Sequence, residues 1–337
     1  ARWSNGCIRW EGTDVSTERI GVLLMAYGTP ESPDEVEPYL THIREHYTYI
    51  RGDKRPSPEM VADLQARYRL IGGRSPLLAI SREQAQALER RLQDTLAPET
   101  GCEFRAYVGM KHWHPFIHDV VRQMAADGVR KAVGIALTAQ YSKLSVGGYI
   151  HAAQEAIEQS GAPMEMTFVE HWHDRPGFLQ ALARRVQAAR TMFPEPVRAD
   201  LPVVFTAHNL PARILEWNDP YPRHMEETAR GVAELAGIRR WFVAWQSAGS
   251  TPVRWLEPEV PEVLTRLRDG GDRAVLICPA GFVADHLEVL YDIDIEARKL
   301  AAELGMQLER TASLNADDDL IDVLAELVRE RVAELVR

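Results

Sequence analysis

The chain has 337 residues, of which 45% are hydrophobic and 26% are charged, and its formal net charge is -10. This length allows two α/β units, each with its own core, and the composition is typical of an ordinary soluble globular protein. The acidic balance argues against a nucleic-acid-binding surface and against general attraction to anionic membranes, because both need an excess of basic residues.

The three cysteines, Cys7, Cys102 and Cys278, are far apart and form no CxxC pair. They indicate neither a disulfide framework nor a cysteine-held metal site, and they fit a reducing compartment. No apolar run approaches the roughly 18 residues of a membrane span, and residues 1–18 lack the apolar core of a signal peptide. We therefore expect a cytoplasmic protein without stable membrane insertion.

Strand and helix patterns alternate along the chain after a polar arm, residues 1–19. Short apolar runs predict strands at 20–26, 103–108, 131–137, 164–169, 203–206, 241–245 and 274–278. Helical patterns fall at 34–44, 58–71, 81–96, 115–126, 149–159 and 317–336. Such alternation predicts parallel sheets that are wound by helices on both faces.

The number of strands predicts two similar α/β lobes, each a parallel sheet of about four strands flanked by helices. We place the boundary at residue 160, so that the lobes comprise residues 20–160 and 161–337, and the last helix can pack across both. The expected cleft between the lobes is a favoured place for a ligand site.

Three carboxylates recur at a spacing of four residues after the strand 274–278: Glu288, Asp292 and Glu296. On an α-helix this spacing keeps them on one face, with a drift of about 40° per step. Like charges at this spacing destabilise a helix, so the row suits a solvated surface or a site where cations or protons neutralise it. Its start at the carboxyl end of a predicted strand, where open α/β sheets bind ligands, favours the second interpretation.

Two further candidates stand at strand ends, and basic residues and tyrosines gather within residues 44–74. His208 follows the strand 203–206, and Tyr27 follows the strand 20–26; each also has an ordinary structural interpretation. The basic and tyrosine cluster suits carboxylates or phosphates of a small ligand, although a solvated helix surface would look the same. Its members are Arg44, Arg51, Lys54, Arg55, Arg67, Arg69, Arg74, Tyr47, Tyr49 and Tyr68.

Seven motifs, in the same order along the chain, resemble those of the ferrochelatase family. They are 25–30 (MAYGTP), 68–77 (YRLIGGRSPL), 109–112 (GMKH), 207–211 (AHNLP), 219–222 (DPYP), 245–247 (WQS) and 281–292 (GFVADHLEVLYD). The resemblance is nearest to the soluble bacterial coproporphyrin ferrochelatases, which carry tyrosine at the Tyr27 position. It implies a chelatase-like fold of two Rossmann-like lobes. It also implies a lyase-class metal chelatase of haem biosynthesis that inserts ferrous iron into coproporphyrin III to give Fe-coproporphyrin III (coproheme).

The resemblance also implies roles for single residues. His208 and Glu288 would be the catalytic pair, facing each other across the porphyrin, with neutral His208 accepting a pyrrole proton near neutral pH. Asp292 and Glu296 would continue as a proton or metal relay, along a helix whose π-type widening would remove the angular drift. Tyr27 would lie on the opposite face, so that iron would meet His208, Glu288 and Tyr27. The porphyrin and its propionates would be held by Tyr27, Arg44, Arg51, Arg67, Tyr68, Ser75, Lys111, His112, Tyr149 and Trp245.

The same resemblance implies no permanently bound cofactor, because ferrous iron is a substrate and no cysteine follows Cys278 to hold an iron-sulfur cluster. Asn209 stands where the family usually has serine. We expect a monomer that binds no nucleic acid and passes its product to the next haem-pathway enzyme, coproheme decarboxylase. The alternatives are a protoporphyrin IX ferrochelatase, a cobalt chelatase of the sirohydrochlorin type and a non-catalytic haem or porphyrin carrier. Whether Arg44 or Arg51 binds propionate is left open.

Overall fold

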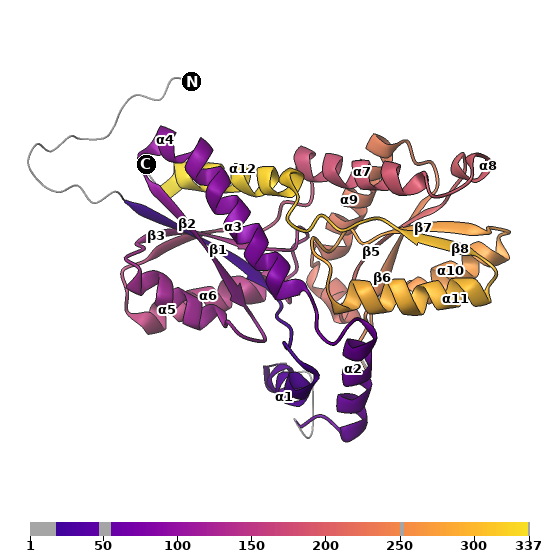
Figure 1. Ribbon diagram of the computed structural model, residues 1–337, viewed down its shortest axis with the longest axis horizontal. Coiled ribbons are helices and arrows are strands. Elements are labelled where there is room, and N and C mark those ends of the chain that lie inside the picture. Colours follow the sequence, from indigo (N-terminus) through magenta and orange to yellow (C-terminus); the bar gives the residue numbers. More distant parts are fainter. Residues whose placement is uncertain (1–17, 47–54, 250–252, 336–337) are drawn as a thin grey trace, which may run out of the picture.

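A computed structural model describes residues 18–46, 55–249 and 253–335 and contains two parallel four-stranded sheets (Figure 1). The first sheet has the order β2-β1-β3-β4 and the second has the order β6-β5-β7-β8, so the same topology occurs twice. The strands are β1 (Arg19–Ala26), β2 (Glu103–Met110), β3 (Lys131–Ala136), β4 (Glu165–Val169), β5 (Val203–His208), β6 (Trp241–Gln246), β7 (Ala274–Cys278) and β8 (Gln307–Arg310). The prediction of two similar α/β lobes is confirmed.

Helices cover both faces of each sheet. In Figure 1, α3, α12, α7 and α9 lie on one side, α5, α6, α10 and α11 lie on the other, and α1 and α2 project from the middle. The α-helices are α1 (Val36–His46), α2 (Pro58–Leu70), α3 (Leu77–Thr95), α4 (Ala97–Thr100), α5 (Ile117–Ala126), α6 (Val146–Ser160), α7 (Pro176–Arg190), α8 (Glu195–Arg198), α9 (Tyr221–Ala236), α10 (Val260–Asp269), α11 (Arg298–Glu303) and α12 (Asp318–Leu335). Two 3-10 helices, η1 (Pro33–Glu35) and η2 (Ala212–Trp217), and a π-helix, η3 (Glu288–Ala297), complete the described elements. Within these ranges, no helix combines the length and the apolar character that crossing a bilayer requires.

The central strands β1, β3, β5 and β7 are buried on both faces, which explains their continuous apolar runs. In β1, Ile20 and Val22 pack into one apolar cluster, while Leu23 and Met25 pack into another with α5 and α6. The first cluster extends through both lobes, because it also contains residues of β5, α7, α9 and α12. Helix α12 lies against α3, β3 and β4 of the first lobe and against α7. The two lobes therefore share part of one hydrophobic core.

The predicted boundary at residue 160 and the assignment of the strand 164–169 to the second lobe are wrong. Strand β4 pairs with β3, with Lys131 opposite Glu165 and Ile135 opposite Val169, and so completes the first sheet. The second sheet instead gains β8, which the sequence did not predict. That strand has four residues and buries only Leu308, so its apolar pattern is too short to detect.

The π-type widening after the loop 279–287 is confirmed by η3. A π-helix has about 4.4 residues per turn, so a step of four residues falls short of a full turn by about as much as an α-helix overshoots it. The drift of the acid row is therefore reversed, and not removed as expected. Glu288 and Asp292 are partly buried, whereas Glu296 is exposed, so the row leads from the interior to solvent.

Gly281 allows the loop after β7 to approach β5. Its backbone N–H donates to the carbonyl of Thr206 at 3.0 Å. A Cβ at this position would lie 2.4 Å from the Cβ of Ala207 and 2.8 Å from its Cα. These atoms are fixed by the backbone, so no side-chain rotation would relieve the overlap.

We predict that Gly281→Ala lowers the free energy of unfolding by about 1–3 kcal/mol, the usual cost of extra atoms in a packed site. Urea denaturation followed by circular dichroism measures this change. Gly270→Ala is the matched control, because a Cβ there meets its nearest atom at 3.3 Å. It should change the stability by less than about 0.5 kcal/mol. Equal stabilities of the two variants would show that the loop can move away from β5 without lowering the free energy of unfolding.

Candidate active site

The carboxyl ends of both sheets border one cavity of about 440 Å³. Tyr27 follows β1, Thr138 follows β3, His208 ends β5 and Gly281 follows β7, and all four line it. In each sheet the first and third strands are neighbours, with the second strand on the far side of the first. This is the topological switch point at which open α/β sheets bind ligands, and the volume is in the range of small-molecule sites.

Most of the cavity wall is apolar, and its polar groups divide by lobe. Apolar side chains that line it include Leu40, Ile43, Leu64, Leu144, Leu210 and Phe282. The first lobe with α1 and α2 adds hydroxyl and cationic groups, whereas the second lobe adds His208, His286 and Glu288. An apolar slot with a few charged groups at its edges suits a flat apolar ligand that carries charged substituents.

His208 and Glu288 meet directly in this cavity. The Nε2 atom of His208 lies 3.4 Å from Oε1 of Glu288. Nδ1 of His208 donates to the carbonyl of Asn209 at 2.5 Å, and the hydroxyl of Tyr221 donates to the carbonyl of His208 at 2.9 Å. The neutral ring would therefore keep its proton on Nδ1, which leaves the Nε2 lone pair free to accept another.

This contact corrects the expectation that the two residues face each other across the porphyrin. A planar ring between two side chains needs about 7 Å, twice a van der Waals contact of about 3.5 Å. The distance of 3.4 Å between His208 and Glu288 leaves no such space. Both side chains must act on the same face of any flat ligand in the cavity.

The pair shifts the pKa values of both partners. Burial lowers the pKa of His208, but the negative charge of Glu288 and its hydrogen bond outweigh burial and raise the pKa to about 9. Burial raises the pKa of Glu288, but the positive charge of His208 and its hydrogen bond outweigh burial and hold the pKa well below its ordinary value. At neutral pH the pair is thus imidazolium and carboxylate, whereas the sequence suggested a neutral histidine.

His286 contacts the other oxygen of the same carboxylate. Its Nε2 lies 3.2 Å from Oε2 of Glu288, and its Nδ1 donates to the carbonyl of Ala284 at 2.9 Å. The sequence-based site did not include His286, although its position two residues before Glu288 was the available signal. One carboxylate between two imidazoles gives the cavity a compact group of titratable side chains.

Asp292 and Glu296 extend this group along η3. Burial raises the pKa of Asp292 to about 6, although a hydrogen bond from the hydroxyl of Ser247 opposes the shift. Asp292 therefore exchanges protons near neutral pH, between partly buried Glu288 and exposed Glu296. The row has the order that a proton relay to solvent requires.

Six of the predicted porphyrin-binding residues line the cavity: Tyr27, Arg44, Tyr68, Ser75, Lys111 and Tyr149. Burial lowers the pKa of Lys111 to about 8, and its ammonium lies 5.5 Å from the centroid of the Tyr149 ring. The hydroxyl of Tyr68 lies 2.7 Å from that of Thr29. These cationic and hydroxyl groups are suited to binding carboxylates.

Three other predicted binders lie outside the cavity wall. His112 is fully buried behind Tyr27, with ring centroids 4.5 Å apart, and Trp245 lies behind Tyr221, with centroids 5.3 Å apart. Arg67 lies beside the acid row, with Nη1 3.9 Å from Asp292. These residues support the wall or the row, and the expectation of direct contact is corrected. Arg51 lies outside the described residues.

Two amides hold the His208–Glu288 pair in place. The Asn209 amide donates to the carbonyl of Leu256 and to Glu259, both at 3.1 Å, and accepts from the N–H of Leu256 at 2.9 Å. The Gln246 amide donates to the carbonyl of Glu288 at 3.0 Å. Asn209 therefore anchors a loop where a serine side chain would be too short to make all three bonds.

We predict that His208 titrates near pH 9 and that Glu288→Gln lowers its pKa to about 6.5 or below. The reason is that the variant removes the negative partner and keeps the burial, which favours the neutral ring. NMR titration of the histidine ring nitrogens measures both values, with exposed His151 as an internal reference. An unchanged His208 titration in Glu288→Gln would contradict the ion pair.

Comparisons with known proteins show which family this site belongs to. The family model described as Ferrochelatase matches residues 19–332. The Ferrochelatase of Herpetosiphon aurantiacus is 43% identical over 310 residues, which are 92% of this chain and 98% of that protein. The Coproporphyrin III ferrochelatase of Geobacillus thermodenitrificans is 42% identical over 321 residues, which are 95% of this chain and 98% of that protein. The solved structure of the sirohydrochlorin chelatase SirB of Bacillus subtilis subspecies spizizenii, in complex with cobalt, has a TM-score of 0.56 at 10% identity. The match covers 93% of this chain and 95% of that chain, and it shows a shared fold.

Proposed function

The chain belongs to the ferrochelatase family, and from this premise we propose that the porphyrin into which it inserts ferrous iron is coproporphyrin III, giving Fe-coproporphyrin III. The observation that carries the proposal is one cavity with the His208–Glu288 pair on one lobe and the cations Arg44 and Lys111 on the other. In this proposal the protein is a lyase-class, cytoplasmic monomer. Iron is its substrate, no resident cofactor takes part, and a coproheme decarboxylase receives the product.

The rim of the cavity supports a porphyrin with many carboxylates. Coproporphyrin carries a propionate on every pyrrole ring, whereas protoporphyrin carries vinyl groups on some of them. Lys111 has a pKa of about 8 because it is buried, and a propionate beside it would restore its full charge. Arg44 and the hydroxyls of Tyr68 and Ser75 line the same cavity and offer further donors. Each ionic hydrogen bond of this kind contributes about 1.5–3 kcal/mol.

The acid row supports proton removal from the porphyrin. Replacing two pyrrole protons by Fe²⁺ conserves charge, so two protons must leave the ring for each ion that enters. The arriving cation repels the proton on His208 and lowers its pKa, which sends this proton toward Glu288 and Asp292. Asp292, with a pKa of about 6, can pass it on to Glu296 at the surface. The neutral Nε2 of His208 then accepts the first pyrrole proton as a general base, passes it along the same row and accepts the second.

The donor atoms of the His208–Glu288 pair also suit weak, transient binding of the metal. Imidazole nitrogen is a good ligand for Fe²⁺, and a carboxylate adds charge without the strength of a thiolate. Among the residues that the structure describes at this cavity, His208, Glu288 and Tyr27 are the proposed metal contacts. Such a set can hold the ion weakly and release it into the four nitrogens of the ring.

We predict that His208→Ala lowers the rate of iron insertion by about 10²–10⁴-fold, the usual contribution of a positioned general base. Porphyrin affinity should change little, because apolar contacts and the rim provide it. Anaerobic addition of Fe²⁺, followed by porphyrin absorbance, measures turnover, and quenching of protein fluorescence measures binding. Exposed His151→Ala is the matched control. The Glu288→Gln variant should show a similar loss of rate. Normal turnover by this variant would contradict the proposed proton relay.

We further predict that the protein prefers coproporphyrin III over protoporphyrin IX by at least about tenfold in kcat/KM. Lys111→Met should reduce this preference by about tenfold, since one charge-assisted hydrogen bond to a propionate is lost. Steady-state assays with both porphyrins and Fe²⁺ measure the two ratios. Preference for protoporphyrin would refute the proposed substrate. Tight binding of coproporphyrin without metal-dependent turnover would support a carrier instead.

A further inference from the structure

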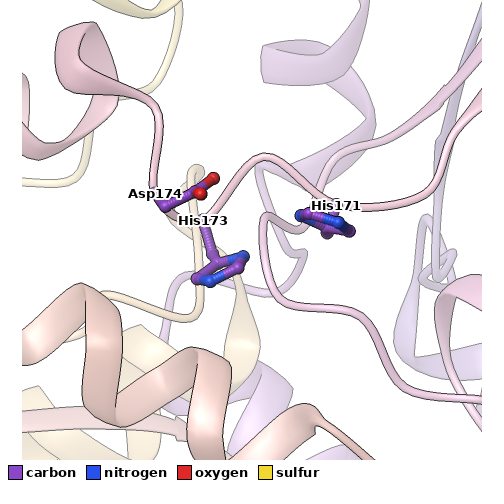
Figure 2. Close-up of side chains that lie close together, drawn as sticks. All are labelled: His171, His173 and Asp174. Atoms are coloured by element: carbon purple, nitrogen blue, oxygen red, sulfur yellow. The ribbon is translucent and has the colours of Figure 1, made fainter.

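Three potential metal ligands lie together on the connector that follows β4. They are His171, His173 and Asp174, and one donor atom of each lies within 4.8 Å of the others (Figure 2). The connector leads from the first sheet to α7, and it also contacts α9, because the hydroxyl of Thr228 donates to the carbonyl of His173 at 3.1 Å. None of these three side chains lines the porphyrin cavity within the described chain.

His173 has the hydrogen bonding that is typical of a metal-binding histidine. Its residue is 3% exposed, and its Nε2 lies 2.8 Å from Oε2 of Glu227, whose carboxylate accepts the ring proton. Nδ1 of the same ring is buried and has no hydrogen-bond partner in the described part of the chain. A buried acceptor without a partner costs about 1–3 kcal/mol. Carboxylates commonly fix the tautomer of a histidine in this way when its other nitrogen binds a metal.

A second group, His173, His224 and Glu227, is equally compact but has unsuitable geometry. Nδ1 of His224 accepts a hydrogen bond from the N–H of Tyr141 at 3.2 Å, so the neutral ring carries its proton on Nε2 and has no free lone pair. The rings of His173 and His224 also stack at 3.8 Å with an angle of 11°. Lone pairs in two parallel planes cannot converge on one ion. The first group is therefore the better ligand set.

We propose that His171, Nδ1 of His173 and Asp174 bind one divalent transition-metal ion of the class of Zn²⁺, Co²⁺ and Ni²⁺, with Glu227 orienting His173. Imidazole and carboxylate together favour these ions over Mg²⁺ and Ca²⁺, which prefer oxygen ligands. A tetrahedral ion with bonds of about 2.0 Å holds its ligands about 3.3 Å apart. His171 and Asp174 are exposed, so their side chains can rotate inward to reach this spacing. Water would fill the fourth position.

The bound ion would stabilise the junction between the lobes. Its ligands belong to the connector after β4, while Glu227 belongs to α9, which also provides Tyr221 to the porphyrin cavity. An ion that binds only the folded protein raises the stability by RT ln(1 + [ion]/Kd). The site is separate from the His208–Glu288 pair, and it therefore does not depend on the proposed porphyrin.

The test uses the full, tag-free chain with His208→Ala and Glu288→Gln, which removes two of the three proposed metal contacts of the cavity. Calorimetric titration with Zn²⁺, visible absorption of added Co²⁺ and thermal unfolding are the measurements. We expect one bound equivalent, Co²⁺ bands typical of nitrogen and oxygen ligands, and a melting temperature that rises with Zn²⁺. Adding His171→Ala and Asp174→Asn should weaken binding by at least about tenfold and abolish the thermal shift.

Two further variants make the outcome specific. Glu227→Gln should weaken binding about 10–100-fold while the Co²⁺ bands keep their positions, because it removes the orienting carboxylate and no ligand. His151→Ala disrupts a surface histidine–acid pair with Glu155 of similar composition and should change nothing. In the otherwise native protein, His171→Ala with Asp174→Asn should retain iron insertion, which shows correct folding. Absence of binding at millimolar Co²⁺, or equal binding after loss of His171 and Asp174, would overturn the proposal.

Discussion

The contact between the imidazole of His208 and the carboxylate of Glu288 is the constraint on which the site depends. It joins the end of β5 to the first residue of η3, two segments that are 80 residues apart. Gly281 permits the close approach of the intervening loop, and Gln246 holds the first carbonyl of η3. Because each partner stabilises the charged form of the other, the pair remains ionic although both residues are partly buried.

The division of charge between the lobes follows from the repeated topology. Each sheet directs the carboxyl ends of its strands toward the same cavity, so each lobe contributes its own set of loops. The first lobe provides the cations Arg44 and Lys111, and the second provides His208, His286 and Glu288. Under the proposed function, a flat ligand between them would be held by its charged edge on one side and would meet the His208–Glu288 pair on the other. Binding and chemistry can be altered separately.

Helix α9 connects the porphyrin cavity with the connector after β4. Tyr221 in its first turn binds the carbonyl of His208, and Glu227 two turns later binds His173. His224 lies between them and stacks on His173. One rigid element therefore carries a contact of the catalytic pair and the orienting carboxylate of the proposed metal site. Metal bound at the connector would restrain the same helix that positions His208.

Local patterns in the sequence determined strands β1 to β7, the helices α1, α2, α3, α5, α6 and α12, and several candidate residues, but not the helices α7, α9, α10 and α11. The apolar runs of seven strands, the row Glu288, Asp292 and Glu296, and the position of His208 at a strand end could all be identified without coordinates, because side-chain periodicity and turn residues act over a few neighbours. The resemblance to ferrochelatases added the π-helix and Tyr27. Only the tertiary structure showed that β4 belongs to the first sheet and that β8 exists.

The tertiary structure also decided which predicted residues meet. It paired His208 with Glu288 on one face, raised the pKa of His208, added His286, and placed His112, Trp245 and Arg67 outside the cavity wall. Strand pairing, burial and the distance between charges depend on residues that are remote in the chain. A pKa depends on the same distances, and so the protonation state of His208 was not accessible from its sequence neighbours.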